Sequence, residues 1–280
     1  MKASRMSAEL VNIEQLIELV SDTSSYQLPS FIGSFDLPTI SGFTLTKGMV
    51  VEAAVALLMI VVFVPLAVKI RSGKPVRGRF WNLLEAFLIY LRNEVIIPAI
   101  GKKDADRFTP FLWTLFFFIL LCNLFGLLPW FGSSPTGSLA TTVVLALSVF
   151  VVLTFSGMKK FGIVGFWKGQ VPQMELPSVL AVFLKPMLFV IEVLGLFIKH
   201  AVLAVRLLAN MFAGHLIIAV IMGFISAVAA GSVFLWGGVT IASVSLCVAL
   251  YMLEIFVAFL QAYIFTFLAS VFIGMAQHQH

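Results

Sequence analysis

A stretch of about 50 predominantly apolar residues, 179–229, limits what this chain can fold into. At 1.5 Å per residue, one helix of that length would be about 75 Å long, more than twice the hydrocarbon thickness of about 30 Å. Such a helix must break, for which Pro186 and Gly195 are candidates, or lie strongly tilted. A second stretch of about 40 residues, 234–275, raises the same problem. Two over-long helices joined near Gly231 predict a slanted hairpin.

The composition places the chain among membrane proteins. Of its 280 residues, 61% are apolar and only 11% are charged, whereas soluble domains carry about 25% charged residues. The net charge of +5 does not indicate nucleic acid, because five of the 18 basic residues lie together in one short segment. They are Lys69, Arg71, Lys74, Arg77 and Arg79. Such clustering is typical of a cytoplasmic membrane loop, so we expect an all-α polytopic membrane protein.

Other apolar segments complete the predicted topology. Residues 48–68, 110–128 and 139–157 each predict a membrane helix, and a Gly- and Pro-rich turn separates the last two. The charged segment 101–107 is expected to be a cytoplasmic loop. Residues 80–97 repeat apolar side chains at helical spacing, which predicts an amphipathic helix on the membrane surface or on a partner protein. We therefore expect about five membrane helices plus one interfacial helix.

The chain ends are assigned by charge. Residues 1–46 lack an apolar core and are mildly acidic, so they are predicted to be extramembranous, ahead of a membrane domain at 47–280. The basic loop puts the N-terminus outside and the C-terminus in the cytoplasm. Cys122 and Cys247 have no metal-ligand spacing and are expected to be small buried hydrophobes. Neither a metal nor a cofactor is predicted.

Two charged residues, Arg206 and Glu254, are the only ones after residue 200, and each lies deep in an apolar run. A central Arg costs about 2.5–3.5 kcal/mol on insertion scales, which makes it a functional candidate. The structural alternatives are an ion pair between the two residues or snorkelling to an interface. Arg stays charged, whereas His215 and Glu254 can exchange protons. We expect a fixed charge at Arg206 and a relay at the other two, although His215 alone could be a satisfied core histidine.

Helical periodicity sorts the polar residues of 179–229 onto faces. Asn210, four residues after Arg206, shares its face, and Lys199 and Glu192, seven and fourteen residues before it, lie close to that face. His215, nine residues on, lies about 180° round the helix. The stripe is what an aqueous or proton pathway needs, with Arg206 pointing away from His215.

The last helix carries its own polar residues. Glu254 and Gln261 are seven apart and share a face, from which Tyr263 is displaced. No phosphate-binding glycine loop, catalytic triad or metal cluster is present in the sequence. The chain alone is therefore not expected to bind a nucleotide or to catalyse a reaction.

Several segments resemble the family of a subunits of F-type ATP synthases. AVRLLANMFAGH (204–215) resembles the family signature, with its essential Arg and the Asn four residues later. LEIFVAFLQAYIFTFLASVFI (253–273) resembles the last helix, CNLFGLLP (122–129) a turn, and GKKDADRFTPFLWTLFF (101–117) the entry to a helix. Together they cover about residues 80–275.

The resemblance implies a role for each matching position. Arg206 would face the carboxylate of a rotating c-ring and separate two half-channels, with Asn210 as its polar neighbour. Gln261 would pack beside the arginine. His215 and Glu254 match a coupled pair in the outer half-channel, where some family members carry the acid and the imidazole in the opposite order. The exchange keeps one of each, which suits a relay.

The inner half-channel and the partners are also implied by the resemblance. Glu192 and Lys199 match polar positions toward it, and Tyr263 completes the predicted proton pathway. The implied partners are the c-ring, the peripheral-stalk b subunits and the lipid bilayer, in a bacterial inner membrane or, alternatively, an organelle inner membrane. The implied ion is H⁺, with Na⁺ as the alternative. A secondary ion transporter is a rival reading, but it predicts internal repeats, and the sequence shows none.

Overall fold

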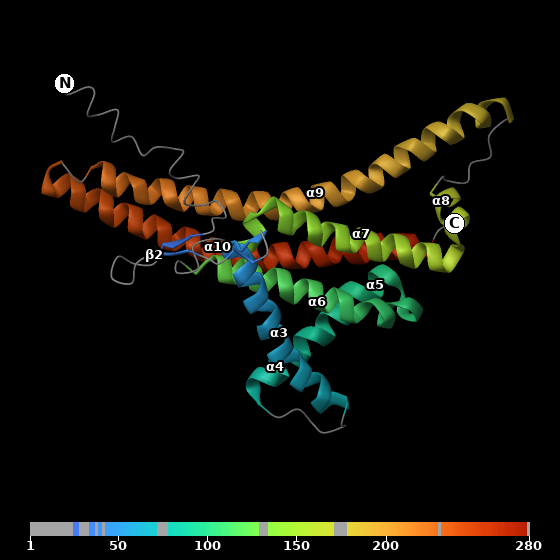
Figure 1. Cartoon of the computed structure of the whole chain (residues 1–280), viewed down its shortest axis with the longest axis horizontal. Helices are drawn as coiled ribbons and strands as arrows, with labels where there is room; N and C mark the ends of the chain where they lie inside the picture. The colour runs from blue at the N-terminus through green and yellow to red at the C-terminus, as the bar shows by residue number, and fades with distance from the viewer. Residues whose placement is uncertain are drawn as a thin grey trace. The chain divides into compact units, whose positions relative to one another are not determined.

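The computed structural model describes most of the chain. The described residues are 25–27, 34–36, 39–40, 43–71, 78–128, 134–170, 178–228 and 231–278. They consist mainly of helices (Figure 1). In chain order these are α3 (Lys47–Arg71), α4 (Arg79–Tyr90), the π-helix η1 (Leu91–Ile96), α5 (Ile97–Ile100), α6 (Lys102–Gly126), the 3-10 turn η2 (Pro135–Gly137), α7 (Leu139–Phe161), α8 (Ile163–Lys168), α9 (Ser178–Ala227) and α10 (Val233–Gln277).

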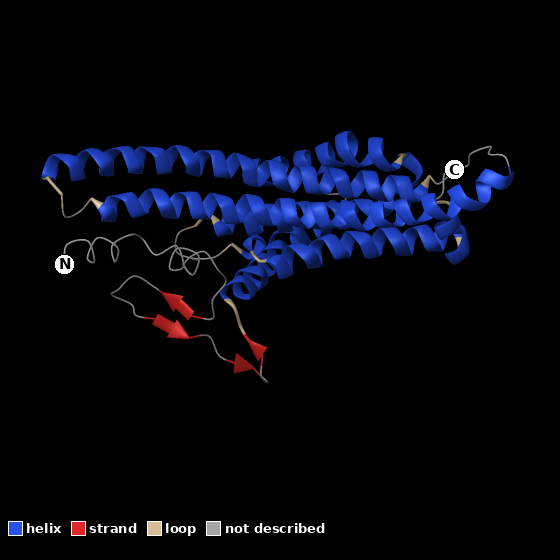
Figure 2. Ribbon diagram, turned by 90° about the horizontal axis from the view of Figure 1, so that it is seen from above, coloured by secondary structure: helices blue, strands red, loops and turns tan. Residues whose placement is uncertain are grey.

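Four short strands precede the helices and pair as two antiparallel ribbons (Figure 2). β1 (Ser25–Gln27) pairs with β2 (Ser34–Asp36), and β3 (Thr39–Ile40) pairs with β4 (Phe43–Thr44). These strands fall in the predicted segment 1–46, much of which lies outside the described residues. Its extramembranous position stays a prediction.

Five of the described helices, α3, α6, α7, α9 and α10, are long and apolar enough to cross a membrane. This confirms the predicted fold class, with the last two helices much longer than the others. α9 has 50 residues without interruption, so the alternative of a break at Pro186 or Gly195 is wrong. An internal Pro removes a backbone donor, but membrane helices tolerate this. The remaining expectation, a strong tilt, stays a prediction.

The predicted loop 101–107 is wrong, because α6 begins at Lys102 and not near residue 110. Gly101, at a φ of 92°, ends the preceding helix. Asp104 lies in the first turn of α6, where the helix dipole favours a negative charge. Its carboxylate also forms an ion pair with Lys160 of α7, with 3.0 Å between Oδ2 and Nζ. The charged residues of 101–107 precede the apolar stretch, as predicted, but they belong to the first turns of α6 and not to a loop.

The predicted amphipathic helix 80–97 is helical but not uniform. α4 ends at Tyr90, and a π-helical turn follows. The wider turn shifts the phase of the helix and leaves Leu91 and Val95 fully buried. Trp113 of α6 donates its indole N–H to the carbonyl oxygen of Leu88 at 3.1 Å, which anchors the end of α4.

The chain divides into two units, and α9 and α10 are each continuous through the division. One unit comprises residues 1–58, 118–141 and 206–261, and the other comprises 59–117, 142–205 and 262–280. In the first unit, the two helices lie side by side as an antiparallel pair (Figures 1 and 2). Ile218, Ile221 and Cys247 form the apolar cluster that joins them.

In the second unit, α10 packs closely on α5. A Cβ at Gly274 would collide with the carbonyl group of Ala99 and approach the backbone of Ile100. Glycine is therefore the residue that lets the two backbones approach, as small residues do between membrane helices.

We expect Gly274→Ala to lower the thermal stability of the fold by about 1–3 kcal/mol, because α5 and α10 must move apart. Heating solubilised membranes with a thiol-reactive dye, and following labelling of this chain at the buried Cys122 and Cys247, measures the effect. Gly238→Ala is the matched control, since a Cβ there meets no atom within 4 Å. Equal labelling temperatures for both variants would contradict the prediction.

Candidate functional site

Arg206 lies on α9, with its side chain exposed on the chain's surface. Within the described part of the chain, its guanidinium has no hydrogen-bond or ion-pair partner. The alternative of an ion pair with Glu254 is therefore wrong for the residues that the structure describes. Asn210, one turn further along the helix, is half-buried. An unpaired guanidinium at membrane depth needs a partner from outside the chain.

Glu254 of α10 approaches α9 in the first unit, at the residue before His215. The carboxylate of Glu254 lies directly against Gly214, where a Cβ would overlap it. His215 follows Gly214 on α9. Oε2 of Glu254 and Nε2 of His215 are both buried, and neither has a hydrogen-bond partner in the described structure. Buried polar atoms of this kind need water or a further polar group.

Gly214 is a functional candidate that the sequence analysis missed. A glycine inside a helix costs about 1 kcal/mol relative to alanine, so its presence mid-helix signals a close approach. Here the approaching group is the Glu254 side chain. The space that Gly214 leaves open allows the carboxylate to reach α9.

Gln261, also predicted, is buried on α10 of the first unit. One turn before it, the carbonyl oxygen of Ala258 accepts a 3.3 Å hydrogen bond from the amide of Asn123 on α6. The amide oxygen of Asn123 accepts a 2.7 Å hydrogen bond from the Thr136 hydroxyl, which in turn lies 2.9 Å from Ser134. This buried network fixes α10 between Glu254 and Gln261. Asn123 was missed as a site residue, although a buried amide in an apolar run is a signal of this role.

A second polar contact of the first unit was also missed. The hydroxyl of Thr141, at the start of α7, donates a 2.6 Å hydrogen bond to the carboxylate of Glu52 on α3. Glu52 is partly buried, and it is the acidic residue that interrupts the first predicted membrane helix. A hydrogen-bonded carboxylate near the end of a span stabilises the contact between two helices.

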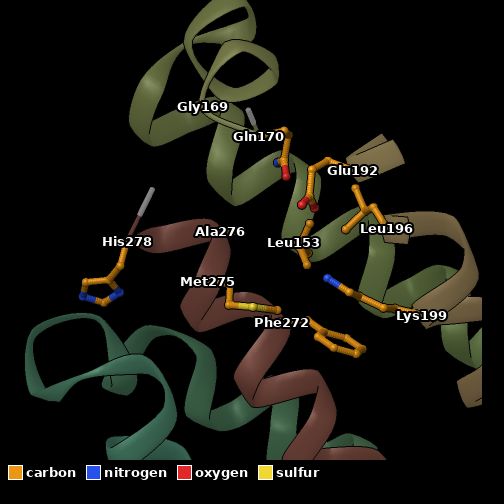
Figure 3. A pocket seen from close by; sticks show the side chains of 10 residues that line it. All are labelled: Leu153, Gly169, Gln170, Glu192, Leu196, Lys199, Phe272, Met275, Ala276 and His278. Atoms are coloured by element: carbon orange, nitrogen blue, oxygen red, sulfur yellow. The ribbon is translucent and has the colours of Figure 1, made fainter. Parts of the chain in front are cut away.

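Glu192 and Lys199 line a cavity of about 260 Å³ in the second unit. They point into the same space as Gln170, from one face of α9 and from the end of α8 (Figure 3). The other wall comes from α10, and His278 lies beyond its last turn. The structure thus brings together two predicted residues and adds Gln170 and His278, which the sequence analysis missed.

Tyr263 is not brought to this cavity. Its ring stacks on that of Phe267 within α10, with the centroids 6.4 Å apart and the planes at 10°. It does not line the cavity around Glu192 and Lys199. Its place in a proton pathway stays a prediction.

The described residues contain no group of three or more His, Cys, Asp or Glu side chains that could hold a metal ion. Cys122 and Cys247 are buried and unpaired in disulfides, as small apolar residues would be. The first unit thus contributes an unpaired guanidinium, a carboxylate and an imidazole, and the second unit contributes a polar cavity. A carboxylate and an imidazole can take up and release protons, whereas the guanidinium stays charged.

Comparison with known proteins places these features in one family. The family model described as ATP synthase A chain matches residues 49–274. A protein named ATP synthase subunit a from Anaeromyxobacter sp. is 42% identical over 235 residues, which are 81% of this chain and 53% of that protein. One of the same name from Myxococcus xanthus is 41% identical over 202 residues, covering 71% and 62%.

A more distant relative, ATP synthase subunit a 2 from Chlorobaculum tepidum, is 36% identical over 264 residues, covering 92% of this chain and 71% of that protein. The chain spans between 53% and 62% of the length of the myxobacterial relatives it matches. The matched region includes α9 and most of α10, and therefore the residues from Glu192 to Tyr263.

We expect Gly214→Ala to push α9 and α10 apart, because the added methyl group takes the space of the Glu254 carboxylate. The cost should be about 1–3 kcal/mol, and Cys247, in the cluster between these helices, should react faster with a thiol dye. Adding Glu254→Ala removes the collision and should restore the slow rate. A double variant as reactive as Gly214→Ala would show that the contact is not the cause.

Proposed function

The chain belongs to the ATP synthase A chain family, and on this premise we propose that it is the stator subunit through which protons reach and leave the rotor of an F-type ATP synthase. It would provide two half-channels and the charge between them. The chain would be non-catalytic by itself, since nucleotide chemistry would belong to other subunits of the complex.

The observation that carries the proposal is the exposed, unpaired Arg206. Lone charges are costly at membrane depth, and the described part of the chain offers this one no partner. A carboxylate presented by a neighbouring subunit would remove the cost. If that carboxylate belongs to a rotating ring, each one is held in its charged form only while it faces Arg206.

The mechanism follows from the cost of moving charge into lipid. A proton that enters one half-channel neutralises a ring carboxylate, and the neutral carboxyl can turn into the bilayer where the charged form could not go cheaply. When it returns to Arg206 from the other side, the guanidinium favours the charged form, and the proton leaves by the second half-channel. The driving force is about 2.3 kcal/mol per charge per 100 mV.

His215 and Glu254 would relay protons on the entry side. Both have a buried atom without a partner in the described structure, Nε2 and Oε2, and both groups can change protonation. Water between them would connect the two atoms without a change in helix packing. Glu192 and Lys199, in the other unit, would serve the exit side through the cavity that they line.

The proposed setting is a bacterial cell membrane, with the N-terminus outside and the C-terminus in the cytoplasm. Lys159 and Lys160 end α7 on the proposed cytoplasmic side, in agreement with the positive-inside rule. The proposed partners are the c-ring, the peripheral-stalk b subunits and the lipid bilayer, and the proposed ion is H⁺. Asn210 and Gln261 would line the contact of Arg206 with the ring.

Arg206→Ala should abolish proton-driven ATP synthesis and ATP-driven proton pumping in membranes that contain the whole complex, because no charge remains to deprotonate the ring carboxylate. Assembly should be retained, since the side chain has no partner within the described chain. The matched control is Arg92→Ala, which removes an exposed arginine paired with Asp106 and should leave pumping nearly unchanged. Undiminished pumping by the Arg206 variant would refute the proposal.

His215→Ala and Glu254→Ala should each slow proton translocation without abolishing it, and each should alter its dependence on pH, because one titrating group of the relay is lost. Pumping rates measured between pH 6 and pH 9 in inverted vesicles test this, with content of the assembled complex determined in parallel. A normal rate and a normal pH profile in both variants would remove the relay assignment.

A further inference from the structure

His200 is a buried titratable residue that the proposed pathway does not use. It lies on α9, one residue after Lys199 and six before Arg206. Its side chain is only 5% exposed and packs between the rings of Phe150 on α7 and Phe272 on α10, with centroid distances of 5.2 and 5.4 Å. The imidazole is therefore enclosed by three helices of the second unit.

The hydrogen bonding of His200 assigns its tautomer. Nδ1 lies 2.8 Å from the carbonyl oxygen of Leu196. A carbonyl oxygen can only accept, so Nδ1 carries the proton and donates it. In the neutral ring Nε2 is then an acceptor with a free lone pair. Nε2 is buried and has no partner in the described residues. A buried acceptor of this kind calls for a donor that enters the site.

A cavity of about 260 Å³ is lined by three residues that also flank His200. The carbonyl oxygen of Leu196 accepts the hydrogen bond from Nδ1, Lys199 precedes His200 in the chain, and Phe272 packs on its ring. The volume is enough for several water molecules, and polar groups of Glu192 and Lys199 would bind them (Figure 3). Water from this cavity is the donor to Nε2 that the relay requires.

The charged and titratable groups around His200 are few. On α9 they are Glu192, Lys199 and Arg206. α7 contributes Lys159 and Lys160, which begin nine residues, or about 13 Å along the helix, after Phe150. α10 contributes Glu254, eighteen residues before Phe272, and His278 follows this helix at the cavity. Glu192 and His278 are the groups among these that line the cavity and can take up a proton from its water.

We propose that His200 is a proton-relay residue on the exit side, which exchanges protons with water of the cavity that Glu192 lines; this rests on the proposed function. Water relays a proton from a protonated ring carboxyl group to Nε2, and the imidazolium forms. The other proton stays on Nδ1, which keeps its hydrogen bond to the Leu196 carbonyl oxygen. Nε2 then releases its proton to cavity water, and from there it passes to Glu192 or to the cytoplasm. His200 is unchanged after each transfer.

A purely structural histidine is the competing explanation. Thr154 of α7 and Thr266 of α10 also have buried hydroxyl groups without partners in the described structure, and a rotated hydroxyl could satisfy Nε2. That arrangement would fix the helices and carry no proton. The two explanations differ in one measurable respect: only a relay makes the rate of conduction depend on titration at position 200.

His200→Gln in the assembled complex tests the proposal. The amide supplies a donor and an acceptor, as the neutral imidazole does, but it cannot titrate. In liposomes with a potassium diffusion potential, passive proton conduction through the membrane sector should fall by about tenfold or more, and its dependence on pH between 5.5 and 9 should flatten. Conduction at the wild-type rate, with the wild-type pH profile, would overturn the relay.

Phe150→Leu is the matched control, because it disturbs the packing around the imidazole and leaves the titrating group in place. It should keep the wild-type pH profile. If it flattens the profile as His200→Gln does, the effect is one of packing, and the relay is refuted. The stator proposal fails separately: a complex that pumps without Arg206 contradicts it, whereas wild-type conduction by His200→Gln in complexes that need Arg206 contradicts only the relay.

Discussion

The cost of an unpaired charge at membrane depth is the constraint on which the rest of this structure depends. Arg92 and Lys160, which lie outside the long apolar runs, have counter-charges in the described chain, Asp106 and Asp104. Arg206 lies in an apolar helix, and the described chain offers it no counter-charge. Two packed membrane helices could have supplied one at Glu254, and they do not. The charge is therefore available to a group from another subunit.

Buried polar groups fall into two classes that follow from the same cost. Asn123, with Thr136 and Ser134, forms a closed network, in which a hydrogen bond to the Ala258 carbonyl oxygen fixes α10. His215, Glu254 and His200 instead each keep one buried atom without a partner in the described residues. Polar groups that are all hydrogen-bonded to one another hold helices in register, whereas a buried polar atom without a partner needs water. These three residues belong to α9 and α10, where the proposed proton paths run.

The sequence was sufficient for what depends on local pattern. The length of the apolar segments predicted the membrane helices, and the small number of charged residues in the last part of the chain identified Arg206 as a functional candidate. Two kinds of error remained. The start of α6 was missed because charge marks the edge of the bilayer and not the end of a helix. Contacts between distant residues were also missed: Asn123 and Ala258 are 135 residues apart, and nothing in the periodicity of either helix places Glu254 against Gly214 rather than against His215 itself.

The continuity of α9 gives the candidate residues a common frame. Glu192 and His215 are 23 residues apart on this helix, and Arg206 stands between them in the sequence. A break at Pro186 or Gly195 would have placed a loop before these groups or between them. Because α9 has no break, the residues proposed for the two proton paths and the charge proposed to divide them all belong to one helix.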